Sequence, residues 1–71
     1  MKKKISIEGM SCGHCVNHTR EALSELNGVT QVEVSLEGKY AIVEASEDVS
    51  DDTIKAAVEE VGYEVVGIEE A

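Results

Sequence analysis

Residues 9–15 of the chain read Gly9-Met10-Ser11-Cys12-Gly13-His14-Cys15. This loop contains both cysteines of the chain, and it joins an alternating stretch at residues 3–8 to a helical pattern that starts near His14. The two thiols are therefore expected where a loop becomes a helix, at the positive end of the helix dipole and close to free backbone N–H groups. Both effects favour thiolate over thiol. A pair of thiolates on such a loop can bind a soft metal ion or cycle through a disulfide.

The pattern of apolar residues around this loop predicts four strands and two helices. Strands are expected at residues 3–8, 32–36, 40–45 and 63–68, and helices at residues 14–26 and 51–61. The third strand is apolar on both faces, which favours a central position, with Ala41, Val43 and Ala45 facing the core. Ser50 is a good N-cap for the second helix, and Gly28 and Gly62 are expected to end the two helices.

The resulting order is β-α-β-β-α-β. With a right-handed crossover, it predicts a ferredoxin-like α+β sandwich, a four-stranded antiparallel sheet in the order 4-1-3-2 with two helices on one face. Residues 1–71 are expected to form a single domain. In this topology the thiol loop, the turn at Gly38 and the loop at Gly62-Tyr63 share one end of the sheet. The acidic loop at residues 46–52 and both termini share the opposite end.

The composition excludes several function classes. The chain has 15 Asp and Glu residues against 6 Lys and Arg, a formal net charge of -9, which argues against nucleic acid and anionic membrane surfaces as partners. No apolar run is long enough for membrane insertion. The lysines at residues 2–4 resemble the start of a signal peptide, but no apolar segment follows them. We therefore expect the chain in the cytoplasm, where thiols stay reduced.

Three uses of the thiol pair compete on the residues alone. Cu(I) and Hg(II) accept two thiolates in a near-linear arrangement. Disulfide exchange is a serious rival because Cys-Gly-His-Cys also occurs in disulfide isomerases, although this chain lacks the proline and the tryptophan of thioredoxin-like sites. A closed zinc site would need four ligands. Only Cys12, His14, Cys15 and His18 are available locally, and closing all four on one ion would strain the loop.

The motif Gly-Met-Ser-Cys-Gly-His-Cys at residues 9–15, in a β-α-β-β-α-β chain of this length, resembles the heavy-metal-associated domain family. That family includes copper chaperones, the N-terminal domains of copper-transporting P-type ATPases and mercury-binding periplasmic proteins. The resemblance covers the whole chain. Ser11 stands where zinc- and cadmium-directed members often have an aspartate, and Gly62-Tyr63 matches the bacterial copper chaperones.

The resemblance implies a copper chaperone rather than an enzyme, with Cu(I) bound by Cys12 and Cys15 and passed by ligand exchange to a P-type ATPase or a similar metal-binding domain. A copper-linked homodimer is a further assembly that it allows. Around the metal, Met10 is expected to anchor the loop to the core, His14 to tune the thiolates, and Tyr63 to reach toward a thiolate. Partner docking is expected at Ser11, Gly13, His14 and Tyr63. The alternative functions are a thiol–disulfide oxidoreductase using the same cysteines, or a binding domain for Hg(II), Zn(II) or Cd(II).

Overall fold

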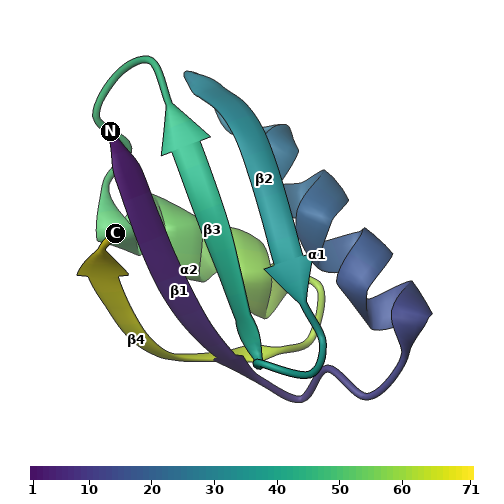
Figure 1. Ribbon diagram of the computed structural model, residues 1–71. Coiled ribbons are helices and arrows are strands. Elements are labelled where there is room, and N and C mark those ends of the chain that lie inside the picture. The colour runs from purple at the N-terminus through teal and green to yellow at the C-terminus, as the bar shows by residue number, and fades with distance from the viewer.

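The computed structural model describes residues 1–71, and its six elements follow the expected order (Figure 1). They are β1 (Lys2–Glu8), α1 (Gly13–Ser24), β2 (Val29–Ser35), β3 (Tyr40–Ala45), α2 (Asp51–Glu60) and β4 (Glu64–Glu70). The strands pair antiparallel in the order β2-β3-β1-β4, and both helices cover the same face of the sheet. Read from the other edge this order is 4-1-3-2, so the ferredoxin-like prediction is confirmed.

The core lies between the inner face of the sheet and the two helices. Ten apolar side chains are buried there: Ile5, Ile7, Met10, Leu23, Ala41, Val43, Ala45, Val49, Ile54 and Val58. The predicted inward phase of β3 is confirmed, because its three inward residues are among them. Ser50 is the N-cap of α2, and its hydroxyl accepts a hydrogen bond from the Thr53 backbone N–H at 3.2 Å. Sequence periodicity and capping therefore placed the second helix correctly.

Helix α1 ends two residues earlier than predicted, at Ser24 rather than Leu26. Gly28 has the expected left-handed φ of 91°, but it lies in the turn into β2 and not at the helix end. Its carbonyl accepts a hydrogen bond from the Ser46 N–H at 2.7 Å, and Val29 pairs with Ala45 of β3. Because these residues pair with β3, β2 begins before the alternating pattern in the sequence does. Helix α1 correspondingly ends earlier than the sequence predicted.

The turn between β2 and β3 also differs from the prediction. Leu36 was expected inside the second strand, but it lies just after β2, and its side chain is 37% exposed. The left-handed residue of the turn is Lys39, with φ of 58°. The Ser35 hydroxyl accepts a hydrogen bond from the Gly38 N–H at 2.9 Å, which holds the chain in this turn. An apolar side chain is therefore left at the surface at this end of the sheet.

Strand β4 contains an irregularity that the sequence pattern did not show. The register with β1 pairs Ile68 with Ile5 but Val65 with Ile7, so one extra residue is accommodated in β4. This bulge lets Val65 and Ile68, three positions apart, both pack against the core, whereas Val66 is 57% exposed. Tyr63, which was expected in this strand, lies in the loop before it.

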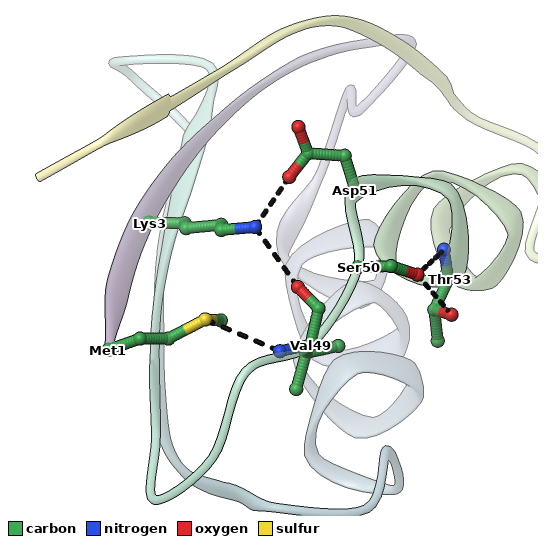
Figure 2. A network of polar contacts seen from close by, with 6 residues as sticks. All are labelled: Met1, Lys3, Val49, Ser50, Asp51 and Thr53. Atoms are coloured by element: carbon green, nitrogen blue, oxygen red, sulfur yellow. Dashed lines mark hydrogen bonds and ion pairs between the residues drawn. The ribbon is translucent and has the colours of Figure 1, made fainter.

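The end of the sheet opposite the thiol loop is held by a polar network, shown in Figure 2. Lys3 Nζ donates hydrogen bonds to Asp51 Oδ1 at 2.6 Å and to the Val49 carbonyl at 3.0 Å. The Val49 N–H in turn donates to the Met1 sulfur at 3.4 Å. These contacts tie the loop between β3 and α2 to β1, and both termini lie at this end (Figure 1). Neither helix has the length and apolar character that crossing a membrane requires.

Candidate metal centre

The two cysteines lie at the junction of the β1–α1 loop and helix α1. Cys12 is the N-cap residue in an extended conformation, and its carbonyl accepts the N–H of Cys15 at 3.0 Å in the first turn. The two sulfur atoms are 3.6 Å apart, and both thiols are free. Cys12 is exposed, whereas Cys15 is half-buried and packs against the core. The structure therefore brings together the pair that the motif predicted.

The spacing of the two sulfur atoms suits a shared metal ion. Metal–thiolate bonds of about 2.3 Å, the length found for zinc, would hold one ion between sulfurs 3.6 Å apart at an S–metal–S angle of about 100°. A linear arrangement needs sulfurs about 4.6 Å apart by the same bond length. Cys12 is on the exposed side of the loop, so an outward movement of about 1 Å at its sulfur would meet that requirement.

The surroundings of Cys15 favour its ionised form. Its pKa is lowered to about 6, first by the neighbouring Tyr63 hydroxyl and then by the backbone N–H of Ser11, while partial burial acts in the opposite direction. The pKa of Tyr63 is raised in turn, chiefly by the neighbouring Cys15 thiol and then by partial burial. The expectation that Cys15 ionises readily is thus confirmed, but the largest cause is a side chain from the α2–β4 loop and not the helix terminus alone.

Gly9 is the residue that lets Tyr63 approach the thiol loop. Its φ of 104° lies in the left-handed region, and a Cβ added there would meet Tyr63 Cδ1 at 3.4 Å. The glycine therefore adopts the required backbone conformation and leaves room for the tyrosine ring. This contact joins the first and last loops at the thiol end of the sheet.

Met10 is a core residue beneath the site. It is 8% exposed and belongs to the buried apolar cluster, in agreement with the predicted role as an anchor for the loop. The Thr19 hydroxyl lies 3.5 Å from the Met10 sulfur and 2.9 Å from the Cys15 carbonyl, and Thr19 is fully buried. The sequence pattern counted Thr19 only as part of the apolar face of the helix. The signal in the sequence that could have revealed these contacts of Thr19 was a polar residue on the apolar face of the helix, one turn after Cys15.

The remaining predicted residues surround the thiols without adding a third ligand. Ser11, Gly13 and His14 are exposed, and the Ser11 hydroxyl lies 3.9 Å from the Cys15 sulfur. His18 is exposed one helical turn beyond His14. No group of three or more His, Cys, Asp or Glu side chains is placed to hold one metal ion. The local donor set is therefore the two thiolates, at a surface open to an incoming molecule.

Comparisons with known proteins agree with this site. The sequence model of the heavy-metal-associated domain matches residues 4–64. The chain is 46% identical over 66 residues to the copper chaperone CopZ of Staphylococcus haemolyticus, a match that spans 92% of this chain and 97% of that protein. A solved CopZ metallochaperone superposes with a TM-score of 0.87 at 37% identity, over 93% of this chain and all of the other. A copper-binding domain from the P-type ATPase HMA7 gives a TM-score of 0.82 at 32% identity, over all of this chain and 95% of that domain. By its sequence, its fold and its cysteine pair, the chain belongs to the heavy-metal-associated domain family.

Proposed function

We propose that this chain is a copper chaperone that binds Cu(I) through Cys12 and Cys15 and delivers it to a copper-binding domain of a P-type ATPase or a similar domain. The observation that carries the proposal is the pair of thiols 3.6 Å apart at an exposed loop–helix junction. Relatives that are copper chaperones, and a structurally similar copper-binding domain of a P-type ATPase, support it.

The chemistry of the donor set favours copper in its lower oxidation state. Thiolates are soft ligands and select Cu(I) over hard cations, whereas zinc in structural sites is held by four ligands. Cys15 is ionised at neutral pH because its pKa is about 6, so copper need not displace a proton from it there. Hg(II), Zn(II) and Cd(II) are the competing ions, and a competition experiment separates them from copper.

Delivery proceeds by exchange of thiolate ligands. A thiolate of the partner forms a third bond to the ion while Cys12 and Cys15 are still bound. One of the two original bonds then breaks, a second thiolate of the partner replaces the other, and each released sulfur takes up a proton according to the pH and its pKa. Copper remains Cu(I) throughout, so no electron donor or acceptor is needed. The exposed position of Cys12 leaves the side from which a partner would approach open.

We place this activity in the cytoplasm, because two exposed or half-exposed free thiols persist where thiols are kept reduced. Two copies that bring their thiol loops together would offer four thiolates, so a copper-linked homodimer is a second assembly to be tested. Mass spectrometry of the intact copper-loaded protein measures both the copper stoichiometry and the number of chains.

The deciding experiment is a titration of the reduced protein with Cu(I) against a competing chelator. The wild-type chain is expected to retain about one equivalent, and Cys12→Ser or Cys15→Ser is expected to lose tight binding. Far-UV circular dichroism serves as the control, because the fold should persist in both variants, with a small loss of stability only at the half-buried Cys15. Wild-type protein that fails to hold copper but reshuffles disulfides of scrambled ribonuclease would instead identify a thiol–disulfide oxidoreductase.

A further inference from the structure

One hollow on the surface differs in charge from all the others. The structure has five surface hollows, and four of them are lined by at least one carboxylate. The fifth lies between the start of α1 and the end of β2, and we call it the α1–β2 groove. It is lined by Gly13, His14, Val16, Asn17, Val34 and Leu36. A groove with no acidic residue is unexpected in a chain with 15 Asp and Glu residues.

Three of the six residues that line the α1–β2 groove are apolar, namely Val16, Val34 and Leu36. Val34 packs against the core, but Leu36 does not belong to the core cluster and is 37% exposed. The turn after β2 thus presents a leucine side chain to solvent beside the thiol loop. Covering this leucine would remove apolar surface from water, which favours association.

The two flanks of the thiol loop are unlike each other. On the flank of Gly9 and Tyr63, Glu8 of β1 stands directly opposite Glu64 of β4, and Lys39 Nζ is 3.9 Å from the Glu8 carboxylate. On the other flank, the α1–β2 groove contains no carboxylate and no lysine or arginine. Apolar contact with a partner is therefore more favourable on the groove side, where the lining itself carries no carboxylate, lysine or arginine to desolvate.

A partner that takes copper from the thiols is expected to reach the α1–β2 groove as well. The groove includes Gly13 and His14, which belong to the thiol loop and the first turn of α1. A weak protein interface of about 500 Å² per partner corresponds to a disc of about 13 Å radius, which extends well beyond the two cysteines. The groove is thus continuous with the surface that ligand exchange requires.

We propose that the α1–β2 groove receives an apolar side chain of the copper-accepting domain during transfer, with Leu36 as the main contact. This inference rests on the proposed function and adds the surface that recognises the partner. It extends the docking surface that the sequence predicted at Ser11, Gly13, His14 and Tyr63 toward the end of β2. The molecule that fills the groove is the acceptor domain. The test below distinguishes it from a second copy of this chain.

The test compares Leu36→Ser with Val66→Ser. Val66 is an apolar residue of β4 that is more exposed than Leu36, so its substitution is a matched control outside the groove. Each copper-loaded variant is mixed with the N-terminal copper-binding domain of a copper-transporting P-type ATPase, and the second-order transfer rate is measured. We expect Leu36→Ser to slow transfer about tenfold. The conservative substitution Leu36→Met should keep the wild-type rate, and Val66→Ser should change the rate less than about twofold.

Three controls make each outcome decisive. Chelator competition on the same samples must give unchanged copper affinity, and thermal unfolding must show that the variants are folded. Equal transfer rates for Leu36→Ser and Val66→Ser would overturn the groove proposal and leave the copper-binding function intact. Sedimentation of the copper-loaded chain is the third measurement. If Leu36→Ser abolishes self-association but not transfer, the occupant is a second copy and the proposal is wrong.

Discussion

Replacing Tyr63 by phenylalanine removes one hydroxyl and tests the electrostatics of the site. The neighbouring Tyr63 hydroxyl is the largest cause that lowers the pKa of Cys15 to about 6. Loss of one hydrogen bond to a charged sulfur should raise that pKa to about 7, with the backbone N–H groups of Ser11 and Cys12 still in place. The thiolate fraction of Cys15 at pH 7 would then fall from about nine-tenths to about one half.

The assay is the pH dependence of alkylation by iodoacetamide in a Cys12→Ser background, where Cys15 is the only thiol. In this background, the midpoint of the rate profile is expected about one pH unit higher in Tyr63→Phe than with Tyr63 present. Tyr40→Phe is the matched control, because Tyr40 is the other tyrosine of the chain and its ring contacts the ammonium of Lys4 at 4.8 Å instead.

The sign of the effect on copper follows from the same pKa. A lowered thiol pKa keeps the ligand ionised above about pH 6, so copper binding is retained above that value and weakens as the pH falls through it. With both cysteines present, Tyr63→Phe should therefore begin to release copper to a chelator about one pH unit higher than the wild type. If Tyr63→Phe and Tyr40→Phe give the same alkylation midpoint, the assigned hydrogen bond is not the cause of the low pKa.

Three further substitutions test the other parts of the argument. Met10→Leu should leave Cu(I) affinity within about twofold in a chelator competition, because a buried residue of similar volume still anchors the loop; a large loss would identify Met10 as a metal ligand. Lys3→Met should lower the free energy of unfolding by about 1 kcal/mol in urea titrations, because it removes the hydrogen bonds to Asp51 and Val49. The pKa of Lys3 is raised, chiefly by Asp51, so this stabilisation should be constant through neutral pH and disappear only when strongly alkaline pH deprotonates the lysine. Asp52→Lys should change the transfer rate only weakly, and less at high salt, since α2 begins at the end of the sheet opposite the thiols; a large effect would place docking at that end.

Much of the fold was accessible from local sequence patterns. Alternation at residues 3–8 and 40–45, and the helical spacing of Ile54 and Val58, report which side of each element is buried, and the structure buries those sides. Six elements in this order leave few ways to connect four strands, so the sheet order followed as well. The patterns failed at the ends of elements. There, the pairing of Val29 with Ala45 and the bulge in β4 depend on the neighbouring strand, which a local pattern does not report.

The sequence by itself determined which sulfur atoms would lie together, because Cys12 and Cys15 are one helical turn apart and the local backbone alone brings their sulfurs close. Only the tertiary structure decided what surrounds them. The Tyr63 hydroxyl lies near Cys15 although its loop is far along the chain, and the α1–β2 groove forms where the start of α1 and the end of β2 lie side by side. Such contacts depend on how separate elements pack and where each one ends. No local periodicity encodes that arrangement, whereas the spacing within a single turn of helix is set by the backbone itself.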